Sequence, residues 1–247
     1  VHKNKTFANP RILICVPTGS TPVERKAIQD SALAAGARRV QLIEEPIAAA
    51  IGAGLPISDA TGSMIVDIGG GTTEIAVMSL GGVVFSKSLR VAGDAMDGAI
   101  INYMRKKFNL LIGESTAEKI KKEIGTAIPT TNNVFLMKGR DIRTGTPKEI
   151  SLTEEDACEA LMPILNQMLS AIKEALESTP PELSADLVDM GLVLTGGGAL
   201  LKNIDKLISK DTGLPVTIAD NPLECVAIGT GKALENEELF STMLSEY

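Results

Sequence analysis

Residues 64–74 read Met-Ile-Val-Asp-Ile-Gly-Gly-Gly-Thr-Thr-Glu, and this stretch decides how the rest of the chain is interpreted. An apolar run ends in one acid, Asp67, and leads into three glycines and two threonines. Because glycine has no Cβ, the backbone N–H groups of Gly69–Gly71 can approach a phosphate, and the hydroxyls of Thr72 and Thr73 add donors. Asp67 is suited to hold Mg²⁺ through water. The stretch predicts a phosphate-binding loop beside a metal-binding acid.

Taken alone, the same stretch also fits an ordinary hairpin turn, because glycines are common between antiparallel strands. A second cluster, residues 191–200, reads Gly-Leu-Val-Leu-Thr-Gly-Gly-Gly-Ala-Leu and repeats the arrangement of an apolar strand followed by glycines. We therefore expect the two loops to form two walls of one nucleotide-binding cleft.

Length and charge restrict the class of protein. The 247 residues can bury a substantial core and predict two structural units, with room for one to be discontinuous in sequence. The net charge is −7 and the isoelectric point is about 4.9, with lysines and arginines scattered along the chain. This charge balance argues against nucleic acid as a main partner.

Cysteine and histidine usage excludes several chemistries. Cys15, Cys158 and Cys225 lack Cys-x-x-Cys spacing, which favours a reducing, cytoplasmic compartment over a disulfide framework or a structural zinc site. With His2 as the single histidine, Ser-His-Asp, Cys-His and His-metal sites lose their central residue. No apolar run is long enough to span a bilayer, and the first residues lack the apolar core of a signal peptide.

The hydrophobic periodicity predicts alternating strands and helices, with a capping box formed by Thr21 and Glu24 at the start of the first helix. Strands are expected at 11–16, 40–43, 64–68, 73–79, 83–90, 192–194 and 215–218, with weak strands between 134 and 150. Helices are expected at 21–35, 46–54, 94–108, 115–126, from Thr153 to about 176, 200–209 and 222–235.

Other nucleotide-binding signatures are absent from the sequence. No strict Gly-x-Gly-x-x-Gly occurs, so a Rossmann site is poorly supported. The segment 229–233, Gly-Thr-Gly-Lys-Ala, fails as a Walker loop because it lacks the upstream glycine and the hydroxyl residue after the lysine.

Three motifs in order resemble the actin, sugar kinase and heat-shock ATPase superfamily. They are Glu44-Glu45-Pro46-Ile47-Ala48-Ala49-Ala50, the phosphate loop from Asp67 to Thr73, and the adenosine loop from Thr195 to Leu200. Within the superfamily the chain most resembles the MreB family, the bacterial actin homologues of cell-shape control, and the similarity covers nearly all of it. The implied fold is α/β, an actin-like (ribonuclease-H-like) ATPase fold that is truncated and carries a small inserted α+β subdomain.

The resemblance implies a division into three parts. Residues 1–54 plus 232–247 would be the remainder of the first lobe, 55–95 plus 167–231 the core of the second lobe, and 96–166 the inserted subdomain. The family's first phosphate loop, Asp-x-Gly-Thr, has no credible substitute here. We therefore expect a chain that lacks its N-terminal portion, binds nucleotide weakly and hydrolyses it negligibly.

The resemblance also implies site roles. Glu45 would position or polarise the attacking water, Thr72 would be the second catalytic residue, and Asp67 would organise Mg²⁺. ATP would contact Gly69, Gly70, Gly71, Thr72, Thr73, Gly93, Asp94, Glu118, Lys121, Lys122, Gly196, Gly197, Gly198 and Ala199.

Ordinary interpretations of these residues stay open. Glu118 and Lys121 match a Glu-x-x-Lys-Arg pattern that clasps the nucleoside, but Lys122 replaces the arginine, and such charges also form surface ion pairs on helices. A glutamate before a proline, such as Glu45, is also a common solvated or capping residue.

The implied function is a cytoskeletal ATPase. Its partners would be other copies of itself in filaments and the cell-wall elongation proteins, with no nucleic acid. It would be cytoplasmic, with membrane contact only through segments absent from this chain. Two alternatives stay open: a small-molecule phosphotransferase such as a sugar or acetate kinase, and a chaperone ATPase domain.

Overall fold

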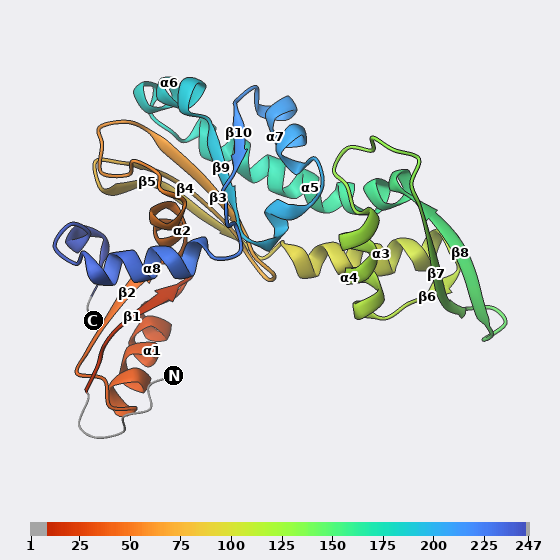
Figure 1. The fold of residues 1–247 in the computed structure, drawn as a ribbon, viewed down its shortest axis with the longest axis horizontal. Coiled ribbons are helices and arrows are strands. Elements are labelled where there is room, and N and C mark those ends of the chain that lie inside the picture. The colour runs from red at the N-terminus through yellow and green to blue at the C-terminus, as the bar shows by residue number, and fades with distance from the viewer. Residues whose placement is uncertain (1–8, 246–247) are drawn as a thin grey trace.

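The computed structural model describes residues 9–245, and these form three β-sheets with helices packed around them (Figure 1). The first sheet pairs β1 (Arg11–Val16) with β2 (Arg39–Glu44) in parallel, joined by α1 (Pro22–Ala34). The predicted capping box begins α1: Thr21 Oγ1 accepts from the Glu24 N–H, and the Glu24 carboxylate accepts from the Thr21 N–H.

The central sheet has the strand order β10-β9-β3-β4-β5. Its strands are β3 (Ser63–Ile68), β4 (Thr73–Ser79), β5 (Gly82–Leu89), β9 (Leu192–Thr195) and β10 (Val216–Ile218). β3, β4 and β5 form an antiparallel meander, whereas β9 lies parallel to β3 with Asp67 opposite Thr195. The two glycine loops therefore leave neighbouring strands at the same edge of the sheet.

Both faces of the central sheet are buried, because side chains of a strand alternate between faces. Met64, Val66 and Ile68 of β3 pack into the core formed with α3 (Gly93–Phe108) and α5 (Glu154–Glu177). Ile65 packs on the opposite face with α2 (Glu45–Ala53) and α8 (Cys225–Glu235). Asp67, two residues after Ile65, belongs to this second face.

Helices α2 and α8 cross with almost no side chain between them. A Cβ on Gly229 would lie 1.7 Å from the Ala48 carbonyl oxygen, and one on Gly52 would lie 1.9 Å from the Cys225 carbonyl oxygen. The small residues predicted in α2 therefore permit direct backbone contact between the two helices.

The third sheet belongs to a smaller unit at the far end of α3, on the right of Figure 1. Its strands are β6 (Leu110–Leu111), β7 (Val134–Asp141) and β8 (Pro147–Thr153), and α4 (Glu114–Ile124) packs against α3 and β7. Thr153 caps α5 through a capping box with Asp156, as expected for that helix start. The three-part division of the chain stays a prediction, and its residues 1–8 and 246–247 lie outside the described residues.

Two parts of the predicted secondary structure are wrong. No helix was predicted between 178 and 191, but α6 (Pro181–Met190) lies there, since a proline is well accommodated in the first turn of a helix. The helix expected at 200–209 is α7 (Ile204–Thr212), because the glycine loop first winds into a short 3-10 turn, Gly197–Leu200, and Asn203 then adopts a left-handed conformation. A second 3-10 turn, Ser241–Met243, follows α8.

Candidate functional site

A cavity of about 790 Å³ lies between the two glycine loops and the start of the smaller unit. This volume is in the range of pockets that bind small molecules and cofactors. Nine of the predicted nucleotide contacts line it: Gly69, Gly70, Gly93, Asp94, Glu118, Lys121, Lys122, Gly197 and Gly198. The tertiary structure therefore brings together four segments that are far apart in the sequence.

The first glycine loop is held from behind by the start of α3. The N–H of Gly93 donates to the Gly69 carbonyl oxygen at 3.1 Å, and the N–H of Asp94 donates to the Gly70 carbonyl oxygen at 2.8 Å. A Cβ added to Gly71 would meet nothing within 4 Å. The loop is thus fixed by its carbonyl groups, and its glycines leave open space in front of the backbone.

The second glycine loop is packed tightly against β3. Gly196 has φ +79°, and a Cβ there would lie 2.3 Å from the Ile68 carbonyl oxygen. A Cβ on Gly198 would lie 2.2 Å from Ile68 Cγ2. In this loop Gly196 and Gly198 are required by the fold, and Gly197 and Gly198 also line the cavity.

Two residues among the predicted contacts have buried side chains. Thr73 is fully buried, and its hydroxyl donates to the Val91 carbonyl oxygen at 2.7 Å, because it lies on the face of β4 opposite Glu74. Ala199 is also fully buried, in the core behind the loop. Neither side chain is accessible to a nucleotide.

Helix α4 supplies the charged wall of the cavity. Lys121 Nζ donates to Asp97 at 2.9 Å and to the Gly93 carbonyl oxygen at 3.0 Å, so it links α4 to the start of α3. Glu118 and Lys122 form an exposed i,i+4 ion pair at 2.6 Å. Sequence reasoning missed Asp97, whose Oδ1 is buried with no hydrogen-bond partner among residues 9–245.

Two exposed leucines stand at the same cavity. Leu200 is 56% exposed and Leu223 is 70% exposed, and both line it. Apolar side chains left in water at a cavity wall indicate a ligand with an apolar face. Leu223 belongs to no motif recognised in the sequence, so only the structure places it at this cavity.

A group of three carboxylates lies on the α2 side of the phosphate loop, outside the lining of the large cavity. Asp67 and Glu74 are paired across β3 and β4, and Glu45 is the first residue of α2. Burial raises the pKa of Glu45, and the Glu74 and Asp67 carboxylates raise it further. Burial likewise raises the pKa of Asp67, which accepts a hydrogen bond from Thr195 Oγ1 at 3.0 Å. Sequence reasoning missed Glu74.

The protein side chains alone do not build a metal cage at this group. Among residues 9–245, no set of three or more His, Cys, Asp and Glu side chains is arranged to hold a metal ion. Asp67 fits Mg²⁺ bound through water, because Mg²⁺ keeps several waters and commonly takes its other ligands from phosphates.

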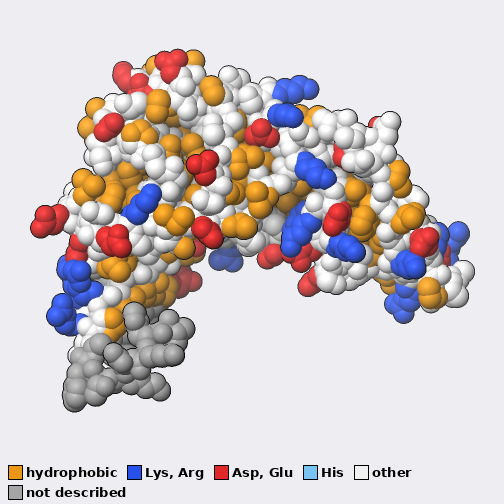
Figure 2. Space-filling view, viewed as in Figure 1, with side chains coloured by type: hydrophobic (Ala, Val, Ile, Leu, Met, Phe, Trp, Pro, Cys, Tyr) orange, Lys and Arg blue, Asp and Glu red, His pale blue; other side chains and the backbone are white. Residues whose placement is uncertain are grey.

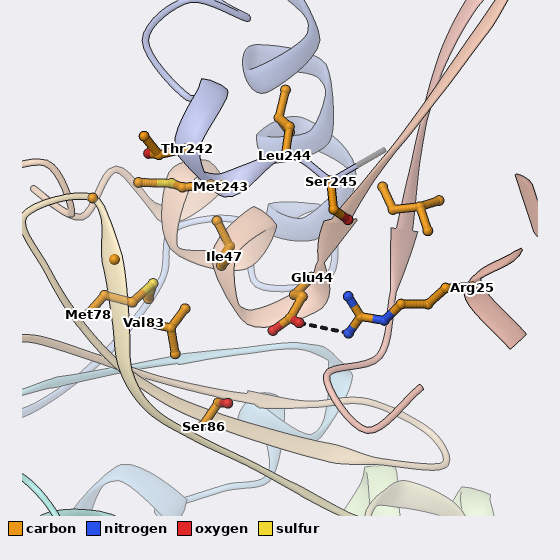
Figure 3. A pocket seen from close by; sticks show the side chains of 13 residues that line it. Arg25, Glu44, Ile47, Met78, Val83, Ser86, Thr242, Met243, Leu244 and Ser245 are labelled. Carbon is orange, nitrogen blue, oxygen red and sulfur yellow. Dashed lines mark hydrogen bonds and ion pairs between the residues drawn. The ribbon is translucent and has the colours of Figure 1, made fainter. Parts of the chain in front are cut away.

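A second cavity, of about 440 Å³, opens between the start of α2, the turn after β4 and residues 242–245 (Figure 3). Arg25 lines this cavity and forms an ion pair with Glu44 at 2.7 Å. The last described residue, Ser245, forms a two-bond antiparallel bridge to Leu42.

On the face drawn in Figure 2, basic and acidic side chains are interspersed. Among the helices of residues 9–245, none has the length and apolar character needed to cross a membrane.

Comparison with known proteins identifies the family. The profile described as "MreB/Mbl protein" matches residues 1–242. The chain is 56% identical over 237 residues to the "Cell shape-determining protein MreB" of Escherichia coli (strain K12), covering 95% of this chain and 68% of that protein. It belongs to the MreB/Mbl family. The "Cell shape-determining protein Mbl" of Bacillus subtilis (strain 168) is 48% identical over 231 residues, covering 93% of this chain and 69% of that protein.

Solved structures share the fold. MreB 5 of Spiroplasma citri bound to AMPPNP superposes with a TM-score of 0.91 at 38% identity, covering 96% of this chain and 72% of that one. The MamK double helical filament subunit superposes with a TM-score of 0.76 at 21% identity, covering 91% of this chain and 68% of that one. The actin-like fold predicted from the motifs is confirmed, and neither the small-molecule kinase nor the chaperone alternative is favoured.

Proposed function

We propose that this MreB/Mbl chain binds ATP with Mg²⁺ in the cavity between the two glycine loops and works as the subunit of an actin-like filament. The observation that carries the proposal is the joint lining of one cavity by Gly69–Gly70, Gly197–Gly198 and the α4 charges. The MreB5 relative of Spiroplasma citri has been crystallised with both AMPPNP and ADP, which supports an adenine nucleotide as the ligand.

The phosphates belong at the first glycine loop. Its N–H groups and the Thr72 hydroxyl are donors of the kind that bind phosphate oxygens. Asp94 carries a negative charge, so its proposed part is to hold the loop through its backbone N–H bond to Gly70. Mg²⁺, held through water by Asp67, would neutralise phosphate charge at the end of β3.

The nucleoside belongs between α4 and the second glycine loop. Glu118 and Lys122 are exposed there and can exchange their mutual ion pair for bonds to ribose and base. Lys121 is better suited to fixing α4 against α3, since its ammonium already has two partners. Leu223 and Leu200 supply an apolar surface for the base.

We expect hydrolysis by this chain to be slow, because the family's first phosphate loop has no counterpart in it, and to depend on Glu45 and Thr72. Phosphoryl transfer needs positioning and charge neutralisation more than covalent help from the protein. A carboxylate whose pKa is raised by burial and neighbouring carboxylates can accept a hydrogen bond from the attacking water and then its proton. We assign Glu45 this role, with the Thr72 hydroxyl as the second contact to that water.

Filament formation is the proposed output. The relatives of this chain are named cell shape-determining proteins, and MamK forms a double helical filament. We extend the proposal to a cytoplasmic filament that organises rod shape at the membrane together with cell-wall elongation proteins.

The direct test combines nucleotide binding with sedimentation. We expect saturable binding of a fluorescent ATP analogue, and we expect ATP with Mg²⁺, but not EDTA, to move the protein into a pellet that contains filaments by electron microscopy. Leu223→Ser should weaken nucleotide binding about tenfold, as expected when part of a leucine contact is lost. Leu239→Ser is the matched control, because Leu239 is 63% exposed away from the cavity. Absence of binding at millimolar nucleotide would contradict the proposal.

A further inference from the structure

Glu74 is a buried carboxylate that the proposed site does not yet use. Only 1% of it is exposed. Its Oε1 accepts from Ser88 Oγ at 2.6 Å, whereas its Oε2 is buried with no hydrogen-bond partner within residues 9–245. A buried charged oxygen without a partner is costly, so it calls for a physical explanation.

The surroundings of Glu74 add to that cost. Asp67 is its cross-strand partner, and Glu45 lies near enough for Glu74 to raise the Glu45 pKa. The carboxylates of Asp67 and Glu45 repel that of Glu74, so this arrangement does not stabilise the fold. An amide of the same size would keep an acceptor for Ser88 without the repulsion between carboxylates, which indicates that the carboxylate serves the site.

Two hydroxyl groups lie beside the Glu74 carboxylate. Burial raises the pKa of Glu74, and hydrogen bonds from the hydroxyls of Ser88, of Thr18 in the turn after β1 and of Thr72 in the phosphate loop oppose that rise. Thr18 Oγ1 is itself buried without a standard hydrogen bond among the described residues. The unpaired acceptor and the unpaired donor therefore occupy the same polar site.

The turn that carries Thr18 is tied to the start of α2. Arg25 donates to the Thr18 carbonyl oxygen at 3.3 Å and to Glu44 at 2.7 Å, as Figure 3 shows for the second bond. Glu44 directly precedes Glu45. A polar network thus extends from the phosphate loop through Glu74 to the helix start that presents Glu45.

We propose that Glu74 is a positioning residue: its free oxygen accepts hydrogen bonds from the Thr72 and Thr18 hydroxyls and holds Thr72 opposite Glu45 on the attacking water. This inference rests on the proposed ATPase function. A carboxylate suits the role because it is acceptor-only and can receive hydrogen bonds on both oxygens at once. An amide retains only one acceptor oxygen.

The test separates positioning from folding. We expect Glu74→Ala to lower the single-turnover rate of ATP hydrolysis at least tenfold, and Glu74→Gln to lower it less. Both should leave the dissociation constant for ATP within threefold of wild type and leave the melting temperature unchanged or higher. Glu149→Gln, at an exposed glutamate of β8, is the control with no expected effect.

A second measurement does not depend on turnover. Methyl NMR of the threonines, assigned through Thr72→Ser and Thr18→Ser, should show one side-chain rotamer for each in the wild type and averaging in Glu74→Ala. Unchanged rotamers and an unchanged hydrolysis rate would overturn the positioning role, as would parallel losses of rate, affinity and melting temperature. If the wild type neither binds nor hydrolyses ATP, the proposed function fails while the rotamers still decide the role of Glu74.

Discussion

The two glycine loops are alike in sequence but differ in what their glycines do. At Gly71 an added Cβ would meet open space, and at Gly70 the first contact would be Asp94 Oδ1 at 3.6 Å, an ordinary van der Waals distance. At Gly196 and Gly198 the same atom would overlap with Ile68. The first loop keeps glycine for the access of a ligand to its backbone, and the second keeps it mainly so that β9 can follow β3 closely. Glycines after a strand can therefore be required for either of two physical reasons, and only the packing around them distinguishes the two.

The largest expected effect comes from Gly196→Ala. The substitution adds strain at φ +79° and an overlap with a backbone oxygen that cannot move freely. Strain at positive φ and overpacking together should cost about 3 kcal/mol or more in the free energy of unfolding. Urea denaturation followed by circular dichroism measures this loss. Gly71→Ala is the matched control, with an expected change within about 0.5 kcal/mol. Equal losses in the two variants would remove the distinction between the loops.

Glu154 holds a segment that packs beside the second glycine loop. Removing its carboxylate should give the next largest loss of stability. This 2% exposed carboxylate accepts from the Thr130 and Thr131 N–H groups and from the Thr131 hydroxyl. Asn203, just after the second glycine loop, donates to the Ile128 carbonyl oxygen of the same segment. Glu154→Gln should cost on the order of 1–3 kcal/mol of stability at neutral pH.

The effect at Glu154 should depend on pH. The hydrogen bond from the Thr131 hydroxyl, followed by that from the Thr130 N–H, lowers the pKa of Glu154 below its ordinary value. The stabilisation is complete above the unfolded glutamate pKa of about 4.3 and is lost as the pH falls through the lower folded-state pKa. Denaturation curves at several pH values should show the difference from wild type shrinking in this acidic window. A difference that stays constant down to pH 3 would contradict the assigned cause.

Gly70→Ala tests the open loop, where function rather than folding should change. We expect unfolding to be unaffected within about 0.5 kcal/mol. The dissociation constant for ATP should rise about tenfold, or about 1.4 kcal/mol, because a methyl group would occupy the cavity wall. Titration with a fluorescent ATP analogue measures the dissociation constant. Gly145→Ala is unsuitable as a control, because Gly145 has a positive φ. Gly113→Ala is the better control, since nothing lies within 4 Å of its added Cβ. Loss of stability without loss of affinity would show that the first loop is also a packing loop.

The smallest effect is expected at the exposed ion pair of α4. Glu118→Gln should change stability by less than about 0.5 kcal/mol, because exposed i,i+4 pairs contribute little. Nucleotide affinity should fall a few-fold if Glu118 contacts the nucleoside. Glu123→Gln on the same helix is the control, since Glu123 is not in the cavity lining. Identical affinities for the two variants would assign Glu118 to the surface alone.

Local patterns in the sequence were enough for much of the fold. Strand β3 is six buried residues long and apolar except for Ser63 and Asp67, so its place in a sheet covered on both faces follows from composition. The helix start at Thr21 followed from capping-box spacing, since that interaction lies within four residues, and Thr153 was expected to cap the long helix α5. Helix α6 was missed because proline both ends helices and is favoured in their first turn. The Pro180-Pro181 pair alone therefore does not show that a new helix begins.

Short motifs, through their resemblance to the MreB family, predicted the actin-like fold, the two glycine loops, and Asp67 and Glu45 as candidate site acids, because strand-loop motifs carry that chemistry in a few adjacent residues. Tertiary structure alone decided that Thr73 and Ala199 are buried, that Leu223 and Asp97 reach the cavity, and that Glu74 stands between Asp67, Glu45 and two threonines. The physical reason is that exposure and partners depend on strand register and on which face of a sheet a residue occupies. Asp67 and Glu74 meet only because β3 and β4 pair in one register, and a shift by one residue would send Glu74 to the opposite face.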